Sequence, residues 1–302
     1  MTKQEEIKRL KEEKDAVILA HYYVEPKVQE VADYIGDSYY LSKVAVELSN
    51  RNIVFCGVSF MGESGKLLNP DKNVLMPDMS ADCPMAHMVT KETVEAARKE
   101  YPDLAVVCYI NSTAEIKSWS DVCVTSANAV KIVKNLPNKH ILFIPDKNLA
   151  HYVASQVPEK EFVYNDGYCP VHEKMSAKEI AELKSSHPQA KVLVHPECNS
   201  EVLEYADYIG STTGIIEYAK NSDATEFIIG TECGVEYALT QARKDAAFYF
   251  PKTRPVCEDM KKITLDKIID VLKNAGNAVQ LPAEDIEKQA KNTLTRMLEL
   301  AK

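Results

Sequence analysis

Three cysteines of this chain have the pattern of metal ligands rather than of core residues. Cys83, Cys169 and Cys257 lie outside the apolar runs that predict strands, and two of them precede a proline. Thiolates are the ligands that iron–sulfur clusters and zinc select. Three thiolates without a fourth leave one coordination position open, as in metal centres that act on a substrate. We therefore predict that these cysteines hold either an iron–sulfur cluster or a zinc ion.

Other cysteines have the pattern of small core residues, which is the alternative for any free thiol. Cys56, Cys108 and Cys123 lie inside apolar runs. The chain has no Cys-x-x-Cys motif, so a zinc ribbon and a thioredoxin site are excluded. Any metal site must therefore collect its thiolates from distant parts of the sequence.

Three hydroxyl side chains stand at the start of predicted helices. They are Ser38, Ser126 and Thr212. The start of a helix has unpaired backbone N–H groups and the positive end of the dipole, which together bind anions. A plain N-cap is the commoner role for any single serine. Three such hydroxyls at matched positions favour a site for carboxylates or phosphate.

Polar residues also end three of the apolar runs. They are His21, Tyr109 and His195, and their neighbours Tyr23, Asn111 and Pro196 are expected to line the same cavity. Histidines can bind anions or transfer protons near neutral pH. Glu197 is the best candidate for a general base, because a dry cavity can raise the pKa of a carboxylate toward neutrality. A surface or capping role is the alternative for Glu197.

These three sets share one long repeat. The stretch Ala-Asp-Tyr-Ile-Gly occurs at residues 32–36 and again at 206–210, and a weaker copy surrounds Asp121. When Asp33, Asp121 and Asp207 are aligned, the residues that end the runs stand 12 positions earlier and the hydroxyls 5 positions later. The cysteines follow the aspartates by 50, 48 and 50 residues. A repeat of this length predicts a repeated structural unit.

Each repeat alternates apolar, β-rich runs with helical patterns, which predicts an α/β fold with parallel sheets covered on both faces. We expect three homologous three-layer αβα domains around a pseudo-threefold axis. Their predicted bounds are 1–84 (completed by 258–302), 85–170 and 171–257. Because ligands of parallel sheets bind beyond the carboxyl ends of the strands, the three sets of residues should converge on that axis.

Composition excludes several other classes of function. The net charge of −9 over 302 residues argues against a nucleic-acid or anionic-membrane partner. No apolar run approaches the roughly 18 residues of a membrane span, and residues 1–15 lack the apolar core of a signal peptide. We therefore expect a cytoplasmic protein, in which the eight cysteines do not form disulfides.

The chain resembles the quinolinate synthase family of NAD biosynthesis over essentially its whole length. The motifs that carry this resemblance are LAHYY (19–23), GDS (36–38), CPMA (83–86), YINS (109–112), TSANA (125–129), GYCPVH (167–172), HPEC (195–198), GST (210–212) and CEDMK (257–261). The resemblance implies one [4Fe–4S] cluster on the axis, with Cys83, Cys169 and Cys257 as ligands and one open iron that acts as a Lewis acid.

The resemblance also implies the reaction and its residues. The chain would condense iminoaspartate with dihydroxyacetone phosphate to quinolinate, with loss of phosphate and two waters, beside an L-aspartate oxidase or dehydrogenase. The implied catalytic residues are Glu197, Tyr23 and Tyr109. The implied substrate-binding residues are His21, Ser38, Tyr109, Ile110, Asn111, Ser126, His195, Pro196, Glu197 and Thr212. Alternatives are another three-cysteine iron–sulfur or zinc hydro-lyase that acts on a different small acid, and a cluster-based sensor without catalysis.

Overall fold

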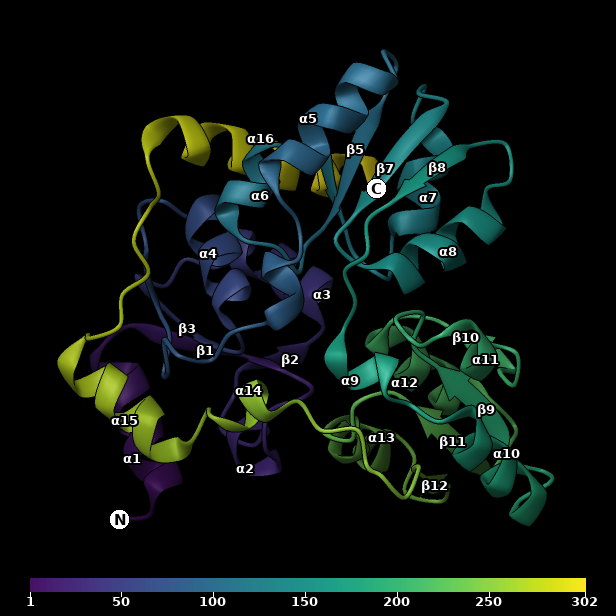
Figure 1. Ribbon diagram of the computed structural model, residues 1–302. Helices are drawn as coiled ribbons and strands as arrows, with labels where there is room; N and C mark the ends of the chain where they lie inside the picture. Colours follow the sequence, from purple (N-terminus) through teal and green to yellow (C-terminus); the bar gives the residue numbers. More distant parts are fainter.

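The computed structural model describes residues 1–302 and contains three four-stranded sheets (Figure 1). The first sheet consists of β1 (Ala16–His21), β2 (Tyr34–Gly36), β3 (Asn52–Cys56) and β4 (Asn73–Leu75). The second consists of β5 (Ala105–Tyr109), β6 (Val122–Val124), β7 (His140–Ile144) and β8 (Glu161–Tyr164). The third consists of β9 (Lys191–Val194), β10 (Tyr208–Ile209), β11 (Glu226–Gly230) and β12 (Ala247–Tyr249).

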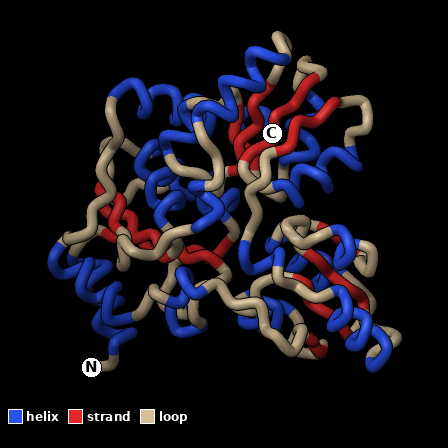
Figure 2. The backbone as a smooth tube through the Cα atoms, in the orientation of Figure 1, coloured by secondary structure: helices blue, strands red, loops and turns tan.

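Strand order is the same in all three sheets, namely β2-β1-β3-β4, β6-β5-β7-β8 and β10-β9-β11-β12. Every neighbouring pair is parallel. The first two strands of each unit therefore lie side by side, and the chain crosses back over them to add the third and fourth. The three equal orders confirm the predicted fold class, and Figure 2 shows the three sheets as separate bodies flanked by helices.

Helices repeat in the same order as the strands. A long helix precedes each unit's first strand: α1 (Lys3–Glu13), α5 (Lys91–Glu100) and α10 (Ala177–Ser186). A short helix follows that strand: α2 (Pro26–Gln29), α6 (Ala114–Ser118) and α11 (Ser200–Leu203). Two longer helices then flank the third strand: α3 (Ser38–Glu47) and α4 (Ser59–Leu68), α7 (Ala129–Asn135) and α8 (Lys147–Gln156), and α12 (Thr212–Asn221) and α13 (Val235–Ala242). No helix combines the length and the apolar character needed to cross a bilayer.

The aligned aspartates of the repeat have a structural role. In each unit the aspartate Oδ2 accepts a hydrogen bond from a strand N–H fifteen residues earlier, and the aspartate N–H donates to the carbonyl of that same residue. The strand partners are Ile18, Val106 and Val192, at N–Oδ2 distances of 2.8, 2.7 and 2.9 Å. A basic side chain pairs with each carboxylate: Lys11, Arg98 and Lys191. The repeated aspartate therefore positions the second strand of each unit against the first.

The C-terminal segment divides between two units. Helix α15 (Leu265–Asn274) packs against α1, whereas α16 (Glu284–Leu300) packs mainly against α6 and β6 and also against α4. Between these two helices, Ala278 forms one isolated antiparallel bridge with Leu75. Helix α16 thus joins the first two units instead of completing the first alone, because its apolar face is covered by both.

The apolar cores follow this division. One continuous core runs through the first and second sheets and the C-terminal helices. The third sheet has two smaller cores, with Val192 and Ile228 on one face and Leu193 and Phe227 on the other. The first two units therefore share one apolar core. The third unit has its own cores, and polar side chains contribute much of its contact with the other two.

Candidate active site

A cavity of about 750 Å³ lies at the meeting point of the three units. The carboxyl ends of the strands face it, since β1 and β5 end at His21 and Tyr109 and His195 follows β9. The predicted site residues on its wall are His21, Tyr23, Ser38, Cys83, Tyr109, Asn111, Ser126, Cys169, His195, Glu197, Thr212 and Cys257. Ile110 and Pro196 are buried beside it and do not reach the wall.

The three cysteines on the wall occupy equivalent positions. Each immediately precedes a short helix: η1 (Pro84–His87) follows Cys83, α9 (Pro170–Glu173) follows Cys169 and α14 (Glu258–Lys261) follows Cys257. Burial raises the pKa of all three thiols, to about 11 for Cys257, and backbone N–H groups of the helix that follows each cysteine oppose this shift. The three sulfurs therefore enter one cavity from three loops, each beside N–H groups that favour a thiolate.

Two fully buried carboxylates lie beside the cysteine loops. Asp146 caps α8, accepting from Leu149 N, and its backbone pairs with Gly167; Glu232 accepts from the backbone N–H of Cys257. Glu232 is fully buried, accepts from Cys257 N at 3.1 Å and pairs with Lys261 Nζ at 3.0 Å. We did not predict these acids, although Asp146 and Glu232 share a signal, since each stands two residues after the third strand of its unit.

His21 and His195 are held in the same way in the first and third units. Nδ1 of His21 accepts from the N–H of Tyr23 at 3.2 Å, and Nδ1 of His195 accepts from the N–H of Glu197 at 3.3 Å. Burial lowers the pKa of both rings to about 4. Both are therefore neutral at pH 7 with the proton on Nε2, so they offer hydrogen-bond donors and not the positive charge expected from their type.

Glu197 is buried between two donors from other segments. Tyr109 Oη donates to its Oε1 at 2.5 Å, and His172 Nδ1 lies 2.7 Å from its Oε2. Burial alone would raise the pKa of Glu197, but His195, His172 and Tyr109 outweigh that effect and lower it. The expected rise toward neutrality is thus wrong in direction, and the side chain is an ionised carboxylate.

The hydroxyls predicted at helix starts are not N-caps. Asp37 and Ser211 cap α3 and α12, accepting from Tyr40 N and Gly214 N. Ser38 and Thr212, the first residues of these helices, line the cavity, and the Thr212 hydroxyl lies 2.7 Å from Tyr23 Oη. Ser126 does not open a helix, because α7 begins three residues later; its Oγ lies 3.2 Å from His195 Nε2.

A family model and several known proteins match this chain over nearly its whole length. A family model described as "Quinolinate synthetase A protein" matches residues 5–299. The chain belongs to this family. It is 51% identical over 296 residues to the quinolinate synthase of Clostridioides difficile (strain 630), covering 98% of this chain and 97% of that protein. It is 51% identical over 298 residues to that of Fusobacterium nucleatum subsp. nucleatum (99% of each chain) and 47% over 303 residues to that of Aquifex aeolicus (99% and 94%).

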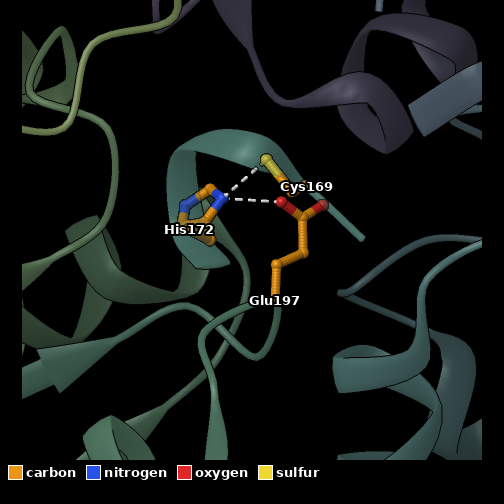
Figure 3. Close-up of side chains that lie close together, drawn as sticks. All are labelled: Cys169, His172 and Glu197. Carbon is orange, nitrogen blue, oxygen red and sulfur yellow. Dashed lines mark hydrogen bonds and ion pairs between the residues drawn. The ribbon is translucent and has the colours of Figure 1, made fainter. Parts of the chain in front are cut away.

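One residue at the centre of this quinolinate synthase family site was missing from our candidates. His172 is almost fully buried in α9, and its Nδ1 lies 3.2 Å from Cys169 Sγ as well as beside Glu197 (Figure 3). Its Nε2 lies 2.9 Å from Thr231 Oγ1, which also bonds Tyr23 Oη at 2.8 Å. The available signal was its place three residues after Cys169, one helical turn away and so on the same side. Cys169, His172 and Glu197 form a group that could bind a metal.

Proposed function

We propose that this chain is a quinolinate synthase that condenses iminoaspartate with dihydroxyacetone phosphate and releases phosphate and two waters. All atoms of the two substrates are accounted for by quinolinate, phosphate and two waters, so no oxidant or reductant is needed. The observation that carries the proposal is the convergence of three cysteines from equivalent loops on the cavity that holds the ionised Glu197. The name shared by the relatives supports the same product.

Cys83, Cys169 and Cys257 would hold a [4Fe–4S] cluster. Sulfurs bound to one zinc ion lie about 3.8 Å apart, given Zn–S bonds of about 2.3 Å in a tetrahedron. The three sulfurs here do not form a group within 4.8 Å of one another, yet all three cysteines line one cavity. That spacing favours a polynuclear cluster over a single ion. When bound, such a cluster supplies an open iron that acts as a Lewis acid toward an oxygen of the substrate.

Glu197 would act as the general base. Its carboxylate is ionised, and the hydrogen bonds from Tyr109 and His172 fix the direction of both oxygens. Loss of water from a condensed intermediate requires removal of a proton from carbon, which a positioned base accelerates. Tyr23 has the opposite character: burial raises its pKa well above the usual value, so the phenol stays protonated between Thr212 and Thr231 and could serve as an acid but not as a base.

The remaining polar groups would bind the anionic parts of the substrates. Neutral His21 and His195 offer Nε2–H donors, and Ser38 and Thr212 offer hydroxyls beside the N-terminal turns of α3 and α12. These donors suit carboxylate and phosphate oxygens. Because imines hydrolyse readily in water, an L-aspartate oxidase or dehydrogenase would have to supply iminoaspartate nearby.

The test is an anaerobic assay with both substrates, in which iminoaspartate is generated in the reaction vessel and quinolinate is measured by chromatography. Iron and sulfide are determined in the same protein sample. We expect quinolinate in proportion to the iron–sulfur content. Protein with a full complement of iron and sulfide that forms no quinolinate would overturn the activity, and quinolinate formation by protein that holds zinc and no sulfide would overturn the cofactor.

A further inference from the structure

One side of the cavity contains a compact set of three different ligand groups. Cys169 Sγ, His172 Nδ1 and a carboxylate oxygen of Glu197 all lie within 4.8 Å of one another (Figure 3). The Sγ–Nδ1 distance is 3.2 Å and the Nδ1–Oε2 distance is 2.7 Å. Zinc binds these three kinds of atom, and its catalytic and exchangeable sites use three protein ligands with a fourth position open.

We propose that the chain, when it lacks an iron–sulfur cluster, binds one zinc ion through Cys169, His172 and Glu197. Bonds of 2.0–2.3 Å in a tetrahedron place the ligand atoms about 3.4–3.6 Å apart. The Cys169–His172 distance is already close to this range. The ion would take the place of the proton between His172 and Glu197, and those two atoms would separate by about 0.7 Å.

Neighbouring side chains hydrogen-bond two of the ligands, His172 and Glu197, through the atoms that would not bind the ion. Thr231 Oγ1 lies 2.9 Å from Nε2 of His172, so it can accept the ring proton while Nδ1 faces the ion. Tyr109 donates to the Glu197 oxygen that does not face His172, at 2.5 Å. Such outer hydrogen bonds orient metal ligands and contribute to affinity. A thiolate and a carboxylate together balance the charge of Zn²⁺, which a buried site requires.

The fourth position would open onto the cavity that all three ligands line. Because Cys169 is also a ligand of the proposed cluster, zinc and cluster would exclude one another; this consequence rests on the proposed function. Zinc would also occupy the Glu197 carboxylate and so remove the proposed base. The site would therefore make the cluster-free chain a zinc-binding and catalytically silent form.

The test uses the full-length chain freed of metal under anaerobic conditions, titrated with zinc by calorimetry and with cobalt by visible absorption. Wild type, Cys83→Ser and Cys257→Ser are expected to bind one zinc with similar affinity and to give the same single-thiolate charge-transfer band with cobalt. His172→Gln, Glu197→Gln and Cys169→Ser should each weaken zinc by roughly 100-fold or more, and Thr231→Val by about 10- to 100-fold.

Circular dichroism and reconstitution with iron and sulfide show whether each variant is folded. His172→Gln should still assemble the cluster while it loses zinc, which separates loss of the zinc site from misfolding. Absence of zinc binding in the wild type would overturn the proposal. So would zinc that is lost in Cys83→Ser and Cys257→Ser but kept in His172→Gln. Neither result would contradict the proposed synthase activity, because the synthase assay uses the cluster-loaded protein.

Discussion

Tyr109 Oη donates a hydrogen bond of 2.5 Å to Oε1 of Glu197, although 88 residues separate the two in the chain. Tyr109 ends β5 in the second sheet, and Glu197 follows β9 in the third. The bond therefore exists only when the two units are packed together. The proposed base is thus assembled at an interface between units, and its protonation state depends on that interface.

Replacing Glu197 with glutamine keeps the size of the side chain and removes the base. We expect Glu197→Gln to retain its iron–sulfur content and to lose roughly 10²- to 10⁴-fold in turnover, the usual contribution of general base catalysis. Quinolinate formation per iron is the measurement. Glu201→Gln, at an exposed position of α11, is the matched control and should behave as wild type. Normal turnover in Glu197→Gln would remove this residue from the catalytic role.

The hydrogen bond from Tyr109 helps to lower the pKa of Glu197. A base works only when ionised, so activity is lost as the pH falls through the pKa of that carboxylate. Tyr109→Phe removes the bond and should raise this pKa, which moves the acidic limb of the pH–rate profile to higher pH. The measurement is kcat/KM from pH 8 down to below 4.5, the ordinary pKa of a glutamate, because the pKa of Glu197 lies below that value. A limb that stays in place would show that Tyr109 does not control the ionisation of Glu197.

Cysteine variants test the proposed ligand set. Cys83→Ala, Cys169→Ala and Cys257→Ala should each reduce iron, sulfide and the visible absorbance to background after anaerobic reconstitution. Cys123→Ala is the control, because Cys123 is fully buried in β6, where its Sγ lies 3.3 Å from Thr293 Oγ1. If Cys123→Ala also loses the absorbance while remaining folded, the ligand assignment is incorrect.

Stability should fall in acid because of two buried histidines. Burial lowers the pKa of His21 and His195 from 6.5 to about 4. Between these values the unfolded chain binds protons that the folded chain excludes, so the free energy of unfolding falls as the pH drops from about 6.5 to about 4. The expected slope is about 1.4 kcal/mol per pH unit for each histidine.

Urea unfolding at half-unit steps of pH measures this slope. His21→Gln should lower the slope by about 1.4 kcal/mol per pH unit, the contribution of one histidine. His151→Gln, at an exposed position, should leave the slope unchanged. Equal slopes in the wild type and in His21→Gln would contradict the assignment of the acid sensitivity to buried neutral rings.

The repeated aspartate is expected to matter for folding and not for chemistry. Asp121→Ala would leave the N–H of Val106, in a fully buried strand, without its side-chain acceptor. An unpaired buried donor costs about 1–3 kcal/mol, and the free energy of unfolding should fall by that amount. Asp166→Ala removes a carboxylate that is 99% exposed and should change it by less than about 0.5 kcal/mol. An unchanged stability in Asp121→Ala would contradict the structural role.

Much of the architecture could be predicted because it depends on local spacing. The distance from each aspartate to the preceding strand is the same in every unit, so one alignment placed three strand pairs and three loops with cysteines. The packing of the C-terminal helix α16 could not be predicted from the repeat, because this helix has no counterpart in the repeat and packs on two units at once. The roles of His172 and Glu232 could not be predicted either, because their partners Glu197, Thr231 and Cys257 lie far from them in the chain.

By itself the sequence determined the three parallel sheets and the equivalent places of Cys83, Cys169 and Cys257, because periodicity and loop position are properties of a single unit. The tertiary structure alone decided that Tyr109 and His172 would flank Glu197, and hence that its pKa falls where burial alone would raise it. The physical reason is range. Hydrogen bonds and ion pairs act over a few ångströms, and the groups that act on Glu197 become neighbours only when separate units pack around one cavity.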